Sequence, residues 1–184
     1  YGNAVESWNV AENIIVEDCL FDNIYDSAVT HQGGKECEAA DGFYIRNNIF
    51  RRCGMAAYEQ RDVLPKRGAF TGNICEEAGE GFSKLGVTMP RNSEIWPAPM
   101  GHHIFLWRID SATGLEEFEI RDNVFGDAPY GAAIYSVNAV EADKATHISG
   151  NQYKMERKCL LNRFYGVDFM DFAAWKNETH NDTL

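Results

Sequence analysis

Five short segments of the chain share one alternation of apolar and polar residues. They read IIVEDCLF (residues 14–21), FYIRNNIF (43–50), AFTGNICE (69–76), FEIRDNVF (118–125) and THISGNQY (146–153), and they stack once AFTGNICE is shifted by one residue. A period of two is typical of β-strands, and no helical period of three to four runs through these segments. The pattern therefore predicts a strand unit that the chain repeats.

The stacked segments place similar residues in three columns, one apolar, one rich in asparagine and one aromatic. The columns contain Val16, Ile45, Phe70, Ile120 and Ile148; Cys19, Asn48, Asn73, Asn123 and Asn151; and Phe21, Phe50, Cys75, Phe125 and Tyr153. Asparagines at the same corner of successive turns can hydrogen-bond to one another at a spacing of about 4.8 Å. We therefore expect an asparagine ladder and an internal stack of aromatic rings.

A second short strand follows each copy after six or seven residues. These strands are predicted as AVTHQ from Ala28, AAYEQ from Ala56, GFSKL from Gly81, AAIYS from Ala132 and LLNRF from Leu160. The links are too short for the crossovers of βαβ units, which need a dozen or more residues. A chain that coils, so that each turn pairs in parallel with its neighbours, meets this constraint. Unrelated strands of a β-sandwich would not explain the matched columns.

The repeated pattern I-x-[RG]-[ND]-N-x-F resembles that of right-handed parallel β-helix proteins of the pectate-lyase-like superfamily, over roughly residues 10–165. The tail VDFMDFAAWKNETHND (167–182) is similar to an F-x-x-W-x-x-x-T-G-x-D segment of bacterial β-helix proteins linked to polysaccharide breakdown, with His180 and Asn181 where the glycine is expected. The resemblance implies an all-β, right-handed parallel β-helix of about five turns over residues 1–165, with residues 166–184 as a C-terminal cap. It also implies a secreted, periplasmic or cell-surface protein.

The two ends of this stack are expected to differ. Phe169, Phe172 and Trp175 lie on one face of a predicted C-terminal helix that can cover the last turn, whereas nothing comparable precedes residue 10. An uncovered end exposes unpaired backbone and core. We therefore expect the chain to be part of a longer β-helix, whose preceding turns would be its partner at this end.

The charge balance narrows the choice of partners. The chain has 184 residues, of which 28 are acidic and 17 basic, for a formal net charge of −11. This argues against duplex nucleic acid and anionic membranes, which require clustered lysine and arginine, and it disfavours polyuronate substrates. No apolar run is long enough to span a membrane. The five cysteines form no C-x-x-C pair, so we expect them to be mostly reduced and buried.

The second strands supply the candidate catalytic residues. Their alignment puts His31, Glu59 and Lys84 at equivalent positions of three successive turns, about 5 Å apart, where they could shift one another's pKa. Asp62 follows as a candidate catalytic carboxylate and Arg61 as a candidate substrate contact. The alternative is a solvated ladder of charges that stabilises the sheet modestly. Strict alternation along its strand would place His31 inward.

The enlarged third turn supplies further candidate substrate-binding residues. Residues 86–101, GVTMPRNSEIWPAPMG, interrupt the repeat with prolines, Arg91 and Trp96, and lead into HHIFLW. Loops of this length in compact domains are usually functional or disordered. Trp96 is a candidate platform for sugar stacking, or else packs against the next turn. His102 and His103 open a strand, so only one of them should face outward.

Three functions fit these residues. A glycoside hydrolase needs two carboxylates, about 5 Å or 6.5–9.5 Å apart, and Glu59 with Asp62 or with an acid on the next turn could serve. A polysaccharide lyase needs a base and a cation, for which Lys84, Arg61 or His31 could act, with or without calcium. A non-catalytic glycan-binding or structural module needs neither.

We expect a glycoside hydrolase that acts on a polysaccharide or oligosaccharide, because paired carboxylates are available and a basic cluster is not. No cofactor is expected apart from calcium, which the acidic segment KECEAADG (35–42) leaves open, although this segment reads mainly as solvated surface. The identity of the sugar and its linkage do not follow from the sequence.

Overall fold

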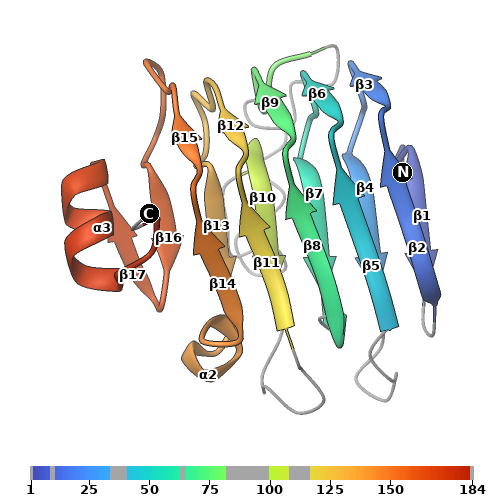
Figure 1. The fold of residues 1–184 in the computed structure, drawn as a ribbon. Helices are drawn as coiled ribbons and strands as arrows, with labels where there is room; N and C mark the ends of the chain where they lie inside the picture. The colour runs from blue at the N-terminus through green and yellow to red at the C-terminus, as the bar shows by residue number, and fades with distance from the viewer. Residues whose placement is uncertain are drawn as a thin grey trace.

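The computed structural model describes residues 2–8, 11–33, 41–62, 65–81, 100–107 and 117–182. The strands form three sheets around one apolar interior (Figure 1). Sheet A consists of β1 (Val5–Trp8), β4 (Ser27–Gln32), β7 (Ala56–Arg61), β10 (His102–Trp107), β13 (Ile134–Val137), β16 (Asn162–Phe164) and β17 (Val167–Phe169). Sheet B consists of β2 (Glu12–Glu17), β5 (Asp41–Arg46), β8 (Arg67–Thr71), β11 (Glu117–Arg121) and β14 (Thr146–Ser149). Sheet C consists of β3 (Leu20–Asp22), β6 (Ile49–Arg51), β9 (Ile74–Glu76), β12 (Val124–Phe125) and β15 (Gln152–Tyr153).

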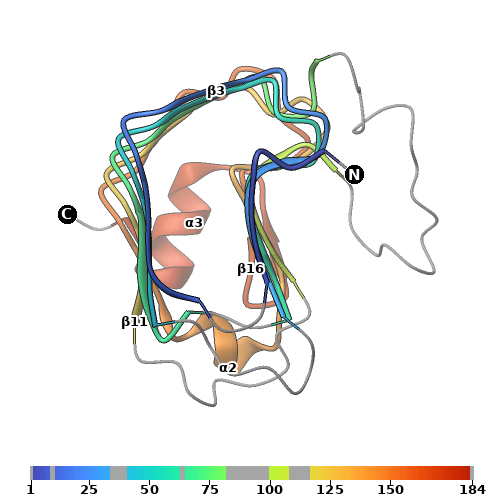
Figure 2. The ribbon, with the colours of Figure 1, turned by 90° about the vertical axis from the view of Figure 1, so that its right-hand side faces the viewer.

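The chain passes through the three sheets in a fixed order. Each repeat adds a strand to sheet B, then to sheet C, then to sheet A, and its strands pair in parallel with the equivalent strands of the next repeat. Among the described strands this order recurs from β2–β3–β4 to β14–β15–β16, and β16 with β17 is the antiparallel exception. Viewed along the stack, equivalent strands lie over one another (Figure 2). The predicted all-β fold with parallel sheets is confirmed.

Strand register confirms the apolar and aromatic columns. The first runs through sheet B, along Val16, Ile45, Phe70, Ile120 and Ile148. The second runs through sheet C, along Phe21, Phe50, Cys75, Phe125 and Tyr153. All of these side chains except Tyr153 are buried. Each large apolar side chain so buried contributes about 1.5–3 kcal/mol, which makes these columns the main stabilising element of the fold.

The asparagine column is a continuous hydrogen-bond ladder. Asn48 Nδ2 donates to Asn73 Oδ1 at 3.1 Å and to the Val16 carbonyl at 2.9 Å, and the backbone N–H of Asn48 also donates to Asn73 Oδ1. The same arrangement repeats from turn to turn, through Cys19, Asn48, Asn73, Asn123, Asn151 and Asp182. The buried amides are thus satisfied without water, which fixes this corner in every turn.

The residue before each ladder position has a left-handed backbone. Its φ angle lies between 53° and 66° in Asp18, Asn47, Gly72, Asp122 and Gly150. Glycine adopts this conformation freely, and asparagine and aspartate tolerate it better than other residues. This explains why the repeat pairs its ladder asparagine with a preceding Asn, Asp or Gly.

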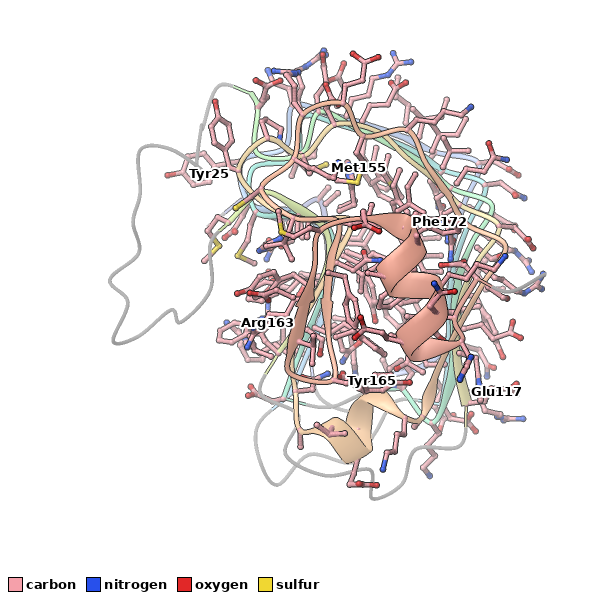
Figure 3. The ribbon with its side chains drawn as sticks, turned by 90° about the vertical axis from the view of Figure 1, so that its left-hand side faces the viewer. Tyr25, Glu117, Met155, Arg163, Tyr165 and Phe172 are labelled. Atoms are coloured by element: carbon pink, nitrogen blue, oxygen red, sulfur yellow. The ribbon has the colours of Figure 1, made fainter. Side chains whose placement is uncertain are left out.

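The C-terminal end of the stack is covered. The helix α3 (Phe172–Thr179) lies across the interior, as the views from both ends show (Figures 2 and 3). Trp175 is fully buried against Phe164 and Phe169, and its indole N–H donates to Asp182 at 2.9 Å. A shorter helix, α2 (Val140–Asp143), lies at the corner between β13 and β14. At the opposite end, the outer edges of β1, β2 and β3 pair with no strand among the described residues.

Two details differ from the sequence prediction. Phe169 lies in β17 and not on α3, and Phe172 is 40% exposed beside Tyr153, so Trp175 anchors the helix. The strand that pairs with β7 on the side away from β4 is β10, whereas the predicted strand GFSKL lies, apart from Gly81, outside the described residues. That segment has the same alternation as a strand, so the pattern could not separate the two.

Candidate functional site

Sheet A has two apolar faces. Alternate residues of its strands point to opposite sides. Tyr58 and Ile104 belong to the interior cluster, whereas Phe105, Trp107 and Tyr135 pack together in a second cluster, with Phe105 and Trp107 stacked at 5.4 Å. We call this second side the outer face of sheet A. Most of its side chains are buried.

The register of sheet A corrects the predicted catalytic column. Glu59 lies opposite Thr30 of β4 and Phe105 of β10, whereas His31 lies opposite Gln60. The prediction that His31 and Glu59 are equivalent is therefore wrong by one residue, and a shift of one residue reverses the face of a strand.

His31 points into the interior. Its ring packs on Phe43 at a centroid distance of 5.3 Å, and its Nδ1 lies 3.2 Å from Ser7 Oγ. The residue is fully buried, and burial lowers the pKa of His31 to about 4, so that the ring is neutral at pH 7. The structure does not bring His31 together with Glu59.

Three predicted site residues lie outside the described residues: Lys84, Arg91 and Trp96. The sequence predicts Lys84 on the strand next to β7, beside Glu59. The strand next to β7 is β10, and its residue opposite Glu59 is Phe105.

Glu59 is a buried carboxyl group on the outer face of sheet A. It is 1% exposed, its Oε1 accepts a hydrogen bond from Trp107 Nε1 at 2.8 Å, and its Oε2 lies 3.2 Å from the hydroxyls of Ser27 and Thr30. Burial raises the pKa of Glu59, against the opposing effects of the Trp107 hydrogen bond and the charge of Arg61. A carboxyl group that keeps its proton toward neutral pH can act as a general acid.

A second carboxylate, Asp26, is better placed beside Glu59 than Asp62. Asp26 is 4% exposed and directly precedes Ser27, whose hydroxyl contacts Glu59, and the charge of Asp26 raises the pKa of Glu59 further. Asp62 follows Glu59 by three residues, about 10 Å along an extended strand. Its backbone is left-handed, with φ of 69°, and its carboxylate lies 3.9 Å from Nε of Arg61.

Arg61 lies between two tryptophans on the outer face. One column of sheet A runs through Trp8, Gln32, Arg61 and Trp107. The guanidinium carbon of Arg61 is 5.6 Å from the ring centroid of Trp8 and 5.3 Å from that of Trp107. Such cation–π contacts hold the charged group in a fixed orientation next to Glu59.

The two adjacent histidines point to opposite faces, as predicted. His102 stacks on Tyr135 of the outer face at 4.3 Å, and its Nδ1 accepts the backbone N–H of Ala132 at 3.1 Å. His103 packs on Phe125 in the interior, and its Nε2 lies 2.8 Å from the carbonyl of Gly126. Burial lowers the pKa of His103 to about 4.

The outer face ends in a second arginine near the C-terminal end of sheet A. Arg163 of β16 lies opposite Tyr135, with its guanidinium carbon 5.8 Å from the ring centroid, and it pairs with Asp168 at 2.6 Å. Figure 3 shows Arg163 on the outside of the stack, away from α3. The face therefore carries aromatic rings between two arginines, Arg61 and Arg163.

Sequence reasoning missed five residues of this site: Trp8, Asp26, Ser27, Thr30 and Trp107. A usable signal for Trp107 existed, because aligning HHIFLW with AAYEQR places Trp107 opposite Arg61. The role of Asp26 had no such signal, since it lies at a corner and not in a strand.

The described part of the chain has neither a metal-binding cluster nor a membrane-spanning helix. It contains no group of three or more His, Cys, Asp or Glu side chains arranged to hold a metal ion. Most of the acidic segment 35–42 lies outside the described residues, and Asp41 pairs with Arg67 at 2.8 Å. Within the described residues, no helix has the length and apolarity needed to cross a membrane.

Comparisons of the chain with family models, with curated proteins and with solved structures found no match.

Proposed function

We propose that the protein is a glycoside hydrolase built on a right-handed parallel β-helix, with Glu59 as its general acid. The main support for this proposal is the environment of Glu59. It is a buried carboxyl group with a raised pKa, hydrogen-bonded to Trp107 on a sheet face rich in aromatic side chains. Buried titratable groups with shifted pKa values concentrate at functional sites. The recurring order of sheets B, C and A supports a β-helix. Its right-handedness is what the resemblance of the sequence pattern implies.

In this proposal Glu59 protonates the glycosidic oxygen of the leaving sugar. Asp26 is the second carboxylate, which stabilises positive charge at the sugar carbon or activates water. The two roles require opposite protonation states, and the burial of Glu59 favours its protonated form. Arg61, fixed between Trp8 and Trp107, offers hydrogen-bond donors to sugar hydroxyls.

The experiment compares Glu59→Gln and Asp26→Asn with wild type on a panel of plant and algal polysaccharides. Reducing ends report hydrolysis, and absorbance of unsaturated products reports elimination. Both variants should lose at least about 100-fold in hydrolysis, the typical scale of an acid–base group. Glu119→Gln, which changes a carboxylate on the outside of sheet B, is the matched control and should retain activity. Full activity of Glu59→Gln would refute the assignment.

A non-catalytic glycan-binding module is the second candidate, because Glu59 is only 1% exposed. Binding to a polysaccharide without release of reducing ends would support it. The lyase alternative has less support, since His31 faces the interior and Arg61 is held between two rings. Unsaturated products would favour the lyase over the hydrolase.

Localisation and the remaining partner follow from the same proposal. A polysaccharide substrate places the protein outside the cell, in the periplasm or on the cell surface. The edges of β1, β2 and β3 that pair with no described strand fit preceding turns of the same β-helix, which would pair in parallel as the described turns do.

A further inference from the structure

We propose that Trp8 is a stacking platform for an uncharged sugar of the bound glycan, at a subsite removed from Glu59. This inference rests on the proposed glycan-binding face and adds the site and the substrate class. Trp8 lies on the outer face of sheet A, in the column that continues through Gln32 and Arg61.

The exposure of Trp8 sets it apart from the other aromatic residues of this face. Trp8 is 55% exposed, whereas Trp107 and Phe105 are fully buried. Arg61 lies against one side of the Trp8 ring at 5.6 Å, and the indole N–H donates to Glu6 Oε1 at 2.5 Å. Among the described residues, these two contacts hold the ring in one orientation and leave more than half of the Trp8 side chain exposed. An aromatic ring fixed in this way can bind the apolar face of a pyranose without loss of conformational freedom.

The position of Trp8 relative to Glu59 fits one continuous glycan. Trp8 is on β1 and Glu59 on β7, with β4 between them. Arg61 shares the column of Trp8, and Glu59 lies two residues before Arg61 on β7. Two strand spacings and a two-residue offset correspond to about 12 Å between the two positions. This distance is comparable with the length of a disaccharide, so a chain cleaved at Glu59 can extend to Trp8 along the stack.

The charges around Trp8 favour an uncharged sugar. Glu6 accepts the indole N–H of Trp8, so a carboxylate lies directly beside the ring. Arg61 lies against the Trp8 ring at 5.6 Å, and its positive charge is offset by Asp62, whose carboxylate lies 3.9 Å from Arg61 Nε. A uronate carboxylate at this subsite would therefore meet a net negative field.

The experiment measures binding by titration calorimetry, with Glu59→Gln as the background to prevent turnover. The probes are cellohexaose, xylohexaose and mannohexaose as neutral oligosaccharides, and hexagalacturonate as the acidic one. Trp8→Ala should weaken binding of a neutral hexasaccharide by about 3- to 10-fold, and Trp8→Phe should retain part of the affinity. Ile15→Ala is the matched control, because Ile15 is a similarly exposed apolar residue of the adjacent turn, on sheet B.

The outcomes separate this inference from the proposed function. Weaker binding in Trp8→Ala with unchanged binding in Ile15→Ala supports the platform. If Trp8→Ala binds the neutral hexasaccharides as tightly as the Glu59→Gln background does, the platform is refuted, while the hydrolase proposal still stands. Tighter binding of hexagalacturonate than of every neutral probe overturns the uncharged substrate class. If no glycan on the wider polysaccharide panel is bound or cleaved, the proposed function itself fails, and the inference fails with it.

Discussion

The carboxylate of Asp182 accepts two hydrogen bonds from Asn151, one from its backbone N–H and one from its side-chain amide, each at 2.9 Å. Every earlier member of the ladder donates to the next turn, so the last member must accept without donating. Aspartate meets this requirement and asparagine does not. The other oxygen of Asp182 accepts from Trp175 Nε1 at 2.9 Å and from the Tyr153 hydroxyl at 2.7 Å. Asp182 thereby joins the ladder to the C-terminal cap.

Replacing Asp182 by asparagine is expected to destabilise the protein by about 2–4 kcal/mol, because the new amide N–H₂ would face the donors of Trp175 and Tyr153 and leave them unsatisfied. Urea unfolding monitored by tryptophan fluorescence measures this change. Glu178→Gln, an exposed substitution in α3, should stay within about 0.5 kcal/mol of wild type. Equal stabilities of the two variants would show that Asp182 does not terminate the ladder.

His180→Gly is expected to stabilise the protein by about 0.5–1 kcal/mol. His180 ends α3 with φ of 57°, a conformation that costs a non-glycine residue more than glycine. Part of that gain is lost to the greater freedom of glycine in the unfolded chain. Thermal unfolding measures the effect, with Ala173→Gly in the first turn of α3 as a control of opposite sign. A loss of stability in His180→Gly would mean that contacts of the histidine side chain outweigh its backbone strain.

The fold followed from the sequence because its columns have strict physical causes. Few residues accept the left-handed corner before each ladder position, and a side-chain amide can both accept and donate between turns. The pairs Asn47-Asn48 and Gly72-Asn73 can therefore be recognised in the sequence. The tail also carried a readable signal, since the resemblance placed Trp175 and Asp182 in one motif, and the structure joins them by a hydrogen bond.

The candidate site was harder to predict, for reasons of register. Its residues lie on strands whose alignment depends on an insertion of unknown length, and GFSKL alternates as well as HHIFLW does. Both Ala28 and Val29 contact the interior, so the alternation in β4 is interrupted only at its start. From Val29 onward it is regular, and the prediction that alternation turns His31 inward is confirmed, whereas the alignment of His31 with Glu59 is wrong.

Asp143 should make stability fall as the pH rises through the range from about 4 to 6. Its carboxylate is buried, accepts from Ser136 Oγ at 2.6 Å and from the Tyr165 N–H at 2.9 Å, and burial raises its pKa from 3.8 to about 6. The folded state therefore binds more protons than the unfolded state in this range, and stability is lost as they dissociate, by up to about 3 kcal/mol.

The variant Asp143→Asn isolates this contribution. Its amide can keep both hydrogen bonds, donating to Ser136 Oγ and accepting from Tyr165, but it does not titrate. Urea unfolding at a series of pH values should show a flatter profile between about pH 4 and 6 in the variant than in wild type. Parallel profiles would mean that Asp143 titrates at its ordinary pKa despite its burial.

Glu59→Gln should raise stability at neutral pH while abolishing hydrolysis. Because burial raises the pKa of Glu59, the protonated form is favoured in the folded state, and stability falls as the pH rises from the ordinary value of 4.5 through the raised one. Glutamine can keep the bond from Trp107 and donate to Thr30 without carrying a charge into the buried site. The variant should therefore equal wild type near pH 4 and exceed it at pH 8 in thermal unfolding.

A gain of stability at the expense of activity distinguishes a functional residue from a structural one. Glu59 would then be a group whose burial disfavours folding but is retained for its chemistry. If Glu59→Gln were instead less stable than wild type at pH 8, the ionised carboxylate would be a structural partner of Arg61, and its raised pKa would not be the property on which the hydrolase depends.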